Sequence, residues 1–249
     1  MTTPVPAVRA AAGSHVGLVR PFNEDAMLTS DTVWAVADGL GGHRAGDVAS
    51  SLAVAAMERL SRDSRRGSAQ ITAAVRETCA SIAADTDPGR EGMATTLSAL
   101  VAGADGRLRT ANVGDSRVYR LREGRLRQLT VDHSEVQQLL DAGLLDAWQA
   151  QHYPRRNVIT RVINARLDTV PDIRTFTPRP GDCYLLCTDG LHGFVDDAVI
   201  AGFLRCDDPE IAVSGLIDAA LAVGGKDNVT VVVAGIEAAA DVTAGTVPA

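Results

Sequence analysis

Short apolar runs rich in β-branched residues, bounded by Gly, Asp or Asn, most constrain how this 249-residue chain can fold. Runs of this kind are typical of buried strands. The segment ADGRLR has an Asp-Gly pair that favours a tight antiparallel hairpin, and REGRLR repeats the theme further along. A doubly wound fold would place a helix after nearly every strand, so we predict antiparallel sheets instead, with a meander in the middle of the chain. The predicted strands are residues 33–37, 97–102, 108–113, 118–121, 183–187 and 229–236.

Apolar residues at four-residue spacing predict a helix over residues 47–61, and three further segments have helical character. Residues 134–162 are polar and contain Trp, Tyr and Pro, which indicates a surface excursion with one short amphipathic piece. Small residues at both ends predict mobile tails, residues 1–6 and 237–249, around a single domain spanning 7–236. The three further helices are expected at residues 70–84, 196–204 and 209–223.

The charge and the cysteine pattern limit the partners and the compartment. A net charge of −7 at pH 7 would repel nucleic acid or an anionic membrane, so we expect neither as a general partner. No apolar run reaches the roughly 18 residues of a membrane span, and the N-terminus lacks the apolar core of a signal peptide. The 4 cysteines form no CxxC pair, so we expect reduced thiols and a cytoplasmic protein.

Four aspartates recur in one setting, at the end of an apolar run and beside a glycine or a turn. VWAVADG places Asp38, YLLCTDG places Asp189, NVGDSR places Asp115, and GGKDNVTVVVA places Asp227 just before a strand. A single Asp-Gly pair needs no explanation beyond a turn. Several aspartates at strand ends, however, are unfavourable to bury unless they share a positive partner.

The ligand types around these aspartates indicate which cation they would share. Carboxylates and backbone carbonyls are hard oxygen ligands, and neither a histidine cluster nor a thiolate cluster accompanies them, so Mg²⁺ or Mn²⁺ is favoured over zinc or copper. Two such ions bridged by one carboxylate can polarise a phosphoryl oxygen and activate water near neutral pH. We therefore predict hydrolysis of a phosphate ester without a covalent enzyme intermediate.

One arginine near the acidic segments could bind the phosphate. Arg20 in VRPFNEDA stands a few residues before Glu24 and Asp25. Its planar guanidinium suits two phosphate oxygens, although an isolated arginine of this kind would be a surface residue.

Taken together, these segments resemble the metal-dependent protein phosphatases of the PPM or type 2C family, especially bacterial members. The resemblance covers about residues 9–236 and rests on several motifs in order: GLVRPFNEDA, VADGLGGHRAGDVAS, MATTLSALV, NVGDSRVYRL, LTVDHSEV, RNVITRVI, GDCYLLCTDGL and GGKDNVTVVV. It implies an α+β fold, a four-layer α-β-β-α sandwich in which helices flank two central antiparallel sheets. It also implies serine/threonine phosphatase activity with two Mn²⁺ or Mg²⁺ ions.

The resemblance also implies roles for individual residues. Asp38 would bridge the two ions, the Gly39 carbonyl would bind one, and Asp189 and Asp227 would hold the other. Residues 134–162 match the flap that helps to select substrates in the family. The remaining roles would be water orientation by Glu24 with support from Asp25, phosphate binding by Arg20, and a weakly held third metal at Asp115.

Two departures from the family pattern affect these assignments. Many eukaryotic members have a histidine directly after the first Asp-Gly as a proposed general acid, whereas this chain has Leu40 there and His43 three residues later. We weigh His43 as the proton donor against a structural role in its loop, with metal-bound water as the leading alternative donor. Many bacterial members place an aspartate where this chain has Gly193, so the sequence predicts that a third ion is weakly held, if at all.

Two other functions fit the same residues. A catalytically inactive phosphatase fold could bind phosphoproteins as a sensor, but it would be expected to have lost metal ligands. A phosphatase for small phosphomonoesters would share the chemistry and differ in substrate.

The flap arginines Arg155, Arg156 and Arg161 could steer acidic phosphopeptides or form an ordinary exposed face. The partners we expect are phosphorylated proteins, substrates of a serine/threonine kinase, and we expect the chain to be a monomer.

Overall fold

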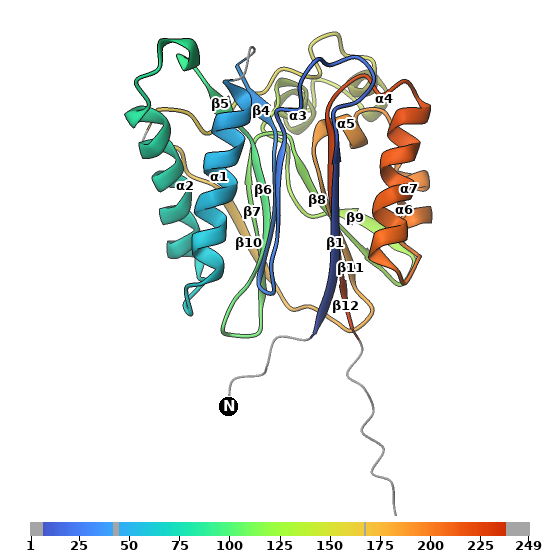
Figure 1. Cartoon of the computed structure of the whole chain (residues 1–249). Coiled ribbons are helices and arrows are strands. Elements are labelled where there is room, and N and C mark those ends of the chain that lie inside the picture. The colour runs from blue at the N-terminus through green and yellow to red at the C-terminus, as the bar shows by residue number, and fades with distance from the viewer. Residues whose placement is uncertain (1–6, 42–44, 167, 238–249) are drawn as a thin grey trace, which may run out of the picture.

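Two antiparallel sheets packed face to face form the centre of the molecule (Figure 1). The computed structural model describes residues 7–41, 45–166 and 168–237. The first sheet has the strand order β10-β7-β6-β3-β2 and the second the order β1-β12-β11-β8-β9. Both are five-stranded. The first sheet comprises β2 (Ala26–Thr29), β3 (Val33–Ala37), β6 (Leu97–Ala102), β7 (Leu108–Val113) and β10 (Asp172–Phe176). The second comprises β1 (Val8–His15), β8 (Arg117–Arg122), β9 (Arg125–Gln128), β11 (Cys183–Cys187) and β12 (Val229–Ile236).

Helices cover the outer face of each sheet, so the molecule has the predicted four layers (Figure 1). Helices α1 (Gly46–Ser61) and α2 (Ser68–Ala84) cover the first sheet, and α6 (Asp197–Phe203) and α7 (Pro209–Ala222) cover the second. Helix α7 begins where Asp208 accepts a hydrogen bond from the Glu210 amide, with Pro209 at the first helical position. The shorter elements are β4 (Gly39–Leu40), η1 (Pro88–Arg90), β5 (Ala94–Thr95), α3 (Glu135–Asp141), α4 (Ala147–Gln151) and α5 (Asp189–His192). No helix in the described residues has the length and apolar character to cross a bilayer.

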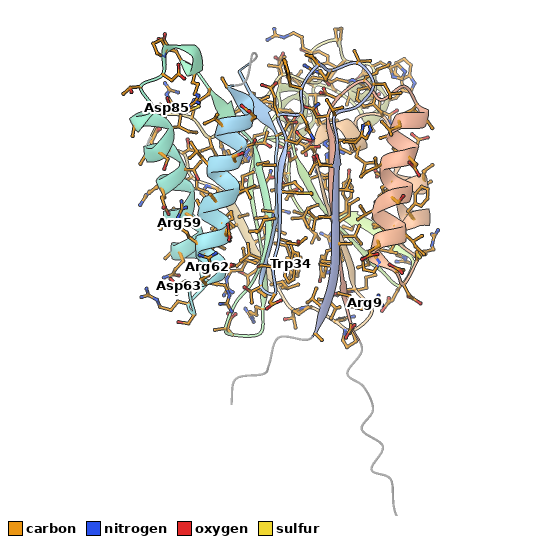
Figure 2. The ribbon with its side chains drawn as sticks, viewed as in Figure 1. Arg9, Trp34, Arg59, Arg62, Asp63 and Asp85 are labelled. Carbon is orange, nitrogen blue, oxygen red and sulfur yellow. The ribbon has the colours of Figure 1, made fainter. Side chains whose placement is uncertain are left out.

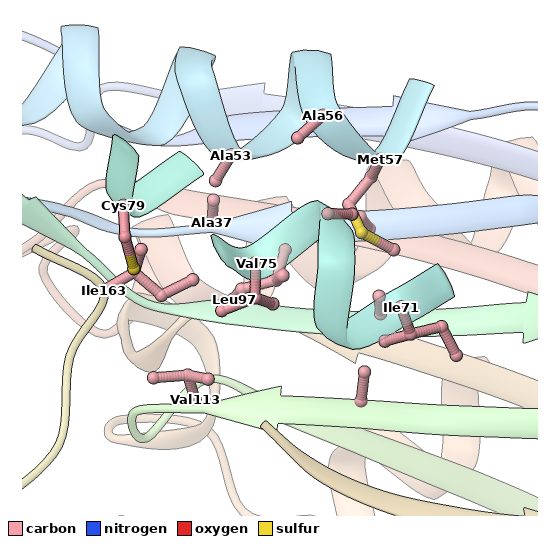
Figure 3. Packing of buried hydrophobic residues seen from close by; sticks show 14 of the residues in the cluster. Ala37, Ala53, Ala56, Met57, Ile71, Val75, Cys79, Leu97, Val113 and Ile163 are labelled. Atoms are coloured by element: carbon pink, nitrogen blue, oxygen red, sulfur yellow. The ribbon is translucent and has the colours of Figure 1, made fainter. Parts of the chain in front are cut away.

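Three apolar layers hold the four layers of the sandwich together. Strand β3 is buried on both faces, which explains its continuous apolar run: Ala35 and Ala37 face α1 and α2, whereas Trp34 and Val36 face the second sheet. Figure 3 shows the layer beneath α1 and α2, and Figure 2 shows Trp34 between the sheets. A third layer lies between the second sheet and α6 and α7.

Both predicted hairpins are present, but they lie in different sheets. Gly106, with φ +72°, turns the chain between β6 and β7, and Gly124, also with φ +72°, turns it between β8 and β9. Between the two hairpins the chain crosses from the first sheet to the second at Gly114–Ser116, so the middle of the chain is not one continuous meander. The crossing matters for function because Asp115 lies on it.

Other predicted elements differ from the structure in their extent. The helices agree within two residues at each end. The sequence pattern does not predict β1, β2 or β10, and the segment 134–162 contains two short helices where it indicates one amphipathic piece. Of the predicted tails, residues 1–6 and 238–249 lie outside the described residues.

Candidate metal centre

The chain brings its strand-end aspartates together at one end of the sandwich. Asp38 follows β3, Asp189 begins α5 directly after β11, and Asp227 precedes β12. Asp115 lies on the crossing between the sheets, and its carboxylate and those of Asp25, Asp189 and Asp227 all act electrostatically on Asp38. Five aspartates, spread from residue 25 to residue 227, therefore contribute carboxylates to one site.

Asp38 is fixed through its backbone, which leaves its carboxylate available to the site. Its amide donates to Thr96 Oγ1 at 2.9 Å, and its carbonyl accepts from the Thr96 amide at 2.9 Å and from Thr95 Oγ1 at 2.9 Å. Burial, followed by the charges of Asp25 and Asp189, raises the pKa of Asp38 well above its usual value. The fold thus holds a carboxylate where its negative charge is unfavourable without a cation.

Three backbone segments pack so closely beside Asp38 that only glycine fits. A Cβ on Gly39 would overlap the Gly46 carbonyl oxygen and would lie 2.5 Å from that of Glu24. A Cβ on Gly46 would lie 2.8 Å from the Gly39 carbonyl oxygen and 2.9 Å from Glu24 Oε1. The Gly39 amide also donates to the Glu24 carbonyl at 3.2 Å, and Ser50 Oγ donates to the same oxygen at 2.6 Å. This packing sets the Glu24 backbone against the proposed ligand Gly39 and the Glu24 side chain against Gly46.

Several buried carboxylate oxygens at this end have no partner within the chain. Glu24 Oε1, Asp25 Oδ1 and Asp115 Oδ1 are all buried without a hydrogen bond. The second oxygen of Asp25 accepts from Thr188 Oγ1 at 2.9 Å, yet burial raises the pKa of Asp25 to about 7. Within the described residues, no group of three or more His, Cys, Asp or Glu side chains is arranged to hold a metal ion. Unpartnered hard oxygens nevertheless fit Mn²⁺ or Mg²⁺, because native proteins otherwise pair buried charges.

Arg20 lies at the edge of this site, paired with one of its carboxylates. Its Nη2 donates to Asp227 Oδ2 at 2.8 Å, and its side chain is 52% exposed. Asp189 and Asp38 also act on it electrostatically. Burial and the neighbouring Asp227 raise the pKa of Asp189 to about 6, and Arg20 offsets only part of that effect. The guanidinium is therefore close enough to bind a group held by the carboxylates and exposed enough to meet it.

Asp115 faces a cavity of about 410 Å³ that joins the carboxylates to the flap. The cavity is also lined by Asp189, Asp227, Asp196 and Asp197. Burial and the charge of Asp189 raise the pKa of Asp115 to about 7. Because Asp196 and Asp197 reach the same cavity, the carboxylate that is absent at position 193 has two neighbours that could replace it.

The histidines of the described chain make structural contacts around the site. His192 Nε2 lies 3.0 Å from the Asp115 carbonyl oxygen, and burial holds the pKa of His192 well below its usual value. The neutral ring therefore contacts the backbone of Asp115. His15 Nδ1 accepts from the Gly17 amide at 2.9 Å. His43, weighed above as a proton donor, lies outside the described residues.

Two of the three flap arginines are neutralised by carboxylates. Arg155 pairs with Glu135 at 2.8 Å, and Arg161 pairs with Asp172 at 2.6 Å. Arg156 lines the cavity and donates to the Gln151 carbonyl at 3.3 Å. The flap is therefore less basic toward a substrate than its sequence indicates.

The residues that hold this site in place leave almost no trace in the sequence pattern. Asn228 Oδ1 accepts from the Glu24 amide at 2.9 Å, and its Nδ2 donates to the carbonyls of Val16 and Phe22, both at 2.9 Å. One side chain thus fixes the loop that carries Arg20 and Glu24. The only sequence signal is its place directly after Asp227, before a buried strand.

Comparison with known proteins agrees with the motifs and the fold. A family profile described as "Protein phosphatase 2C" matches residues 20–207. The chain belongs to this family. It is 44% identical over 235 residues to the serine/threonine protein phosphatase PstP of Mycobacterium tuberculosis, a match that covers 92% of this chain and 45% of PstP. The chain thus spans less than half the length of that relative.

Other relatives match over nearly their whole length. The serine/threonine phosphatase Stp of Listeria innocua is 35% identical over 86% of this chain and 90% of its own. The crystal structure of the M. tuberculosis phosphatase PstP/Ppp superposes with a TM-score of 0.89 at 42% identity, over 93% of this chain and all (100%) of that one. The PstP catalytic domain in complex with 2 manganese ions gives a TM-score of 0.86 at 41% identity, over 93% and 99% of the two chains.

Proposed function

We propose that this chain is a metal-dependent phosphatase that hydrolyses phosphoserine and phosphothreonine in other proteins. The observation that carries the proposal is the set of buried carboxylates with unpartnered oxygens, next to a half-exposed arginine, at one end of a phosphatase 2C fold. The named relatives are serine/threonine phosphatases, and one of their structures holds 2 manganese ions. The carboxylate set of this chain suits the same ions.

In this proposal each residue has a defined task. Asp38 bridges two Mn²⁺ or Mg²⁺ ions, the Gly39 carbonyl binds one of them, and Asp189 and Asp227 hold the other. When bound, such ions lower the pKa of a coordinated water and neutralise charge on the phosphoryl oxygens. Asp115 is the candidate ligand of a weaker third ion.

The residues that do not hold metal act on the water and the phosphate. Glu24 Oε1, buried and without a partner, accepts a hydrogen bond from the attacking water. Asp25 supports that loop, because Thr188 fixes one of its oxygens. Arg20 binds a phosphate oxygen with the guanidinium nitrogens that Asp227 does not use.

The finer aspects of the proposal concern partners and compartment. The substrates would be phosphoproteins made by a serine/threonine kinase, and the cavity that joins the carboxylates to the flap offers room for a phosphorylated side chain. Free thiols at Cys79, Cys183, Cys187 and Cys206 are consistent with a reducing, cytoplasmic environment. Helices cover both outer sheet faces, which favours a monomer.

The test compares phosphoserine, phosphothreonine and phosphotyrosine peptides with p-nitrophenyl phosphate, each with Mn²⁺, Mg²⁺ or EDTA. We expect phosphate release from the first two peptides only when metal is present. Equal turnover of all peptides in EDTA would contradict the metal-dependent function. A kcat/KM for p-nitrophenyl phosphate at or above that of the peptides would instead favour a phosphatase of small phosphomonoesters. An inactive protein that binds the phosphopeptides would be a sensor.

A further inference from the structure

A buried histidine outside the metal centre holds the turn that carries Asp115. The His133 amide donates to the Gly114 carbonyl oxygen at 2.9 Å, and the Gly114 amide donates to His133 Nδ1 at 3.0 Å. Both peptide groups of Gly114 are thus bound by one residue. The His133 side chain is only 8% exposed, so water cannot readily replace its ring.

The other side of the same histidine faces Asp172, the first residue of β10, which pairs with Arg161 at the end of the flap. Because Nδ1 accepts a hydrogen bond, the proton of the neutral ring is on Nε2. Nε2 lies 3.3 Å from Asp172 Oδ2, without the alignment of a full hydrogen bond. The Asp172 carboxylate also accepts from Arg161 Nη1 at 2.6 Å. Burial lowers the pKa of His133, which favours this neutral form.

His133 also joins the two strands of chain at the base of the flap. Its carbonyl accepts from the Thr160 amide at 2.7 Å, and two residues later the Glu135 amide donates to the Val158 carbonyl at 2.9 Å. These bonds close the segment 134–162 at its ends. The residue that holds Gly114 therefore also holds the flap.

The Gly114 turn is rigid on the side that faces the metal centre. Gly114 has φ +102°, and a Cβ there would lie 2.6 Å from the Thr96 side chain. Thr96 Oγ1 in turn hydrogen-bonds Ser116 Oγ at 2.8 Å and accepts from the Asp38 amide at 2.9 Å. A shift of this turn would thus reach both Asp115 and the backbone of Asp38.

We propose that His133 is a positioning residue that couples the base of the flap to the turn carrying Asp115. The flap, the turn that carries Asp115 and, through Thr96, the backbone of Asp38 are then held in one arrangement by a single residue, whose ring binds Gly114 and whose backbone binds Thr160. Its consequence for catalysis rests on the function proposed above, whereas the coupling itself is a property of the metal-free protein.

The coupling can be measured by hydrogen exchange of the full chain in EDTA. The reporters are the amides of Gly114, which donates to the ring, and Thr160, which donates to the backbone carbonyl of residue 133. The variants are His133→Leu, which retains bulk without an acceptor, and His133→Asn, whose side-chain oxygen can stand near the position of Nδ1. The control is His152→Ala, a flap histidine whose Nδ1 lies 2.8 Å from the Trp148 carbonyl in an exposed position.

We expect His133→Leu to speed exchange at both Gly114 and Thr160 by about tenfold or more, as loss of a buried hydrogen bond allows. His133→Asn should restore both, and His152→Ala should change neither. Faster exchange at Gly114 alone, or at neither amide, would overturn the coupling. The exchange rate of the Val232 amide in β12 reports global unfolding. If His133→Leu fails to fold, the test rests on His133→Asn. Unequal protection of the Gly114 and Thr160 amides in that variant would overturn the proposal.

Activity adds a second readout that depends on the flap. The quantity to compare is the gain in kcat/KM from His133→Leu to His133→Asn. This gain should be larger for a phosphothreonine peptide than for p-nitrophenyl phosphate, which is too small to reach the flap. Equal recovery for both substrates would contradict a role in positioning the flap. An inactive wild-type protein would contradict the proposed function and leave the exchange result intact.

Discussion

An aspartate lies at each end of strand β11, and the two have opposite electrostatic environments. Asp182, 1% exposed, accepts hydrogen bonds from Arg122 Nε at 2.5 Å, Arg122 Nη2 at 2.6 Å, the Arg179 amide at 2.8 Å and Tyr184 Oη at 2.7 Å. Burial alone would raise its pKa, but these donors outweigh burial and the pKa lies below its usual value.

Asp189, at the other end of the strand, lies among carboxylates. Burial and Asp227 raise its pKa to about 6, since Arg20 is shared with Asp227 and compensates only in part. The difference shows which buried carboxylates are neutralised by side chains of this protein and which are not. At the Asp182 end it supplies an arginine and a tyrosine, whereas at the Asp189 end it leaves a deficit of positive charge that a metal would remove.

The strongest test of this comparison replaces one aspartate of the carboxylate site, Asp38, and the paired aspartate at the other end of β11, Asp182, each by its neutral isostere. Asp38→Asn should lower kcat by at least about three orders of magnitude, because the proposed bridge between both ions loses its charge. Asp182→Asn should leave kcat within about twofold, since that end of the strand takes no part in the reaction. Phosphate release from a phosphothreonine peptide at saturating Mn²⁺ measures both, and near wild-type turnover by Asp38→Asn would refute the bridging role.

The same comparison predicts opposite effects on stability in EDTA. Asp182→Asn should lower the free energy of unfolding by about 2–4 kcal/mol, because the Arg122 charge loses its partner. Asp189→Asn should raise it by about 1–3 kcal/mol, because an uncompensated buried charge is removed. Thermal unfolding should shift by roughly 2–4 °C per kcal/mol in a chain of this size. Two shifts of the same sign would contradict the contrast between the ends.

Replacing Arg20 tests whether its positive charge acts on the substrate or only on Asp227. Arg20→Ala should lower kcat/KM by about one to two orders of magnitude, as expected for a lost charge-assisted contact of about 1.5–3 kcal/mol. Arg20→Lys should recover only part, because an ammonium lacks the planar fork. Steady-state kinetics decide the matter, and unchanged kcat and KM in Arg20→Ala would make Arg20 a surface partner of Asp227. Arg59 of α1, labelled in Figure 2, is a matched control because it also forms an ion pair at 2.8 Å, with Glu77 of α2, and its side chain is 51% exposed.

The pH dependence of stability should also differ between the two ends. The folded-state pKa of Asp182 is lowered, so its contribution is complete above the unfolded value near 4 and is lost as the pH falls through the folded value. The pKa of Asp25 is raised to about 7, so in EDTA the folded state binds a proton that the unfolded state releases. Stability should therefore fall as the pH rises from about 4 to 7, by at most about 1.4 kcal/mol per pH unit per proton.

Urea unfolding at intervals between pH 3 and 8 measures both effects. Asp182→Asn should flatten the profile below pH 4, and Asp25→Asn should reduce the slope above pH 4, where Asp38, Asp115 and Asp189 also have raised pKa values. Mn²⁺ should also reduce the slope above pH 4, since a bound cation favours ionised carboxylates. A metal-free protein that gains stability from about pH 4 to 7 would contradict the charge deficit inferred at this end.

The sequence predicts the features of the fold and site that depend on local chemistry. The two hairpin turns contain the positive φ angles that such turns need, at Gly106 in one and at Glu123 and Gly124 in the other, and the aspartates at the strand ends fall at one site. The sequence does not predict β1, because the pairing of Val8–His15 with β12, from the opposite end of the chain, makes it a strand. The supporting contacts of Asn228 and His133 are equally non-local, so no spacing in the sequence reveals them.

The smallest expected effect concerns Gly193, four residues after Asp189. The family pattern suggests that Gly193→Asp adds a weak third metal site, since each added carboxylate strengthens the binding of hard cations. The structure adds an opposing factor, because a Cβ at this position would lie 2.7 Å from the Asp189 carbonyl oxygen. The backbone of Asp189 would have to shift, which should weaken the main site slightly.

Gly193→Ala separates these two effects, since it introduces the same Cβ without a carboxylate. In Mn²⁺ titration calorimetry we expect the alanine variant to lower the affinity of the main site by about two- to fivefold, and the aspartate variant to show the same loss together with one weak additional site. The cavity beside Asp115 already contains Asp196 and Asp197, so the wild-type protein could hold a third ion through them. Three tight sites in the wild type would show that these neighbours replace the missing carboxylate. The Asp189 end of β11 would then bind still more metal charge, whereas the Asp182 end binds none.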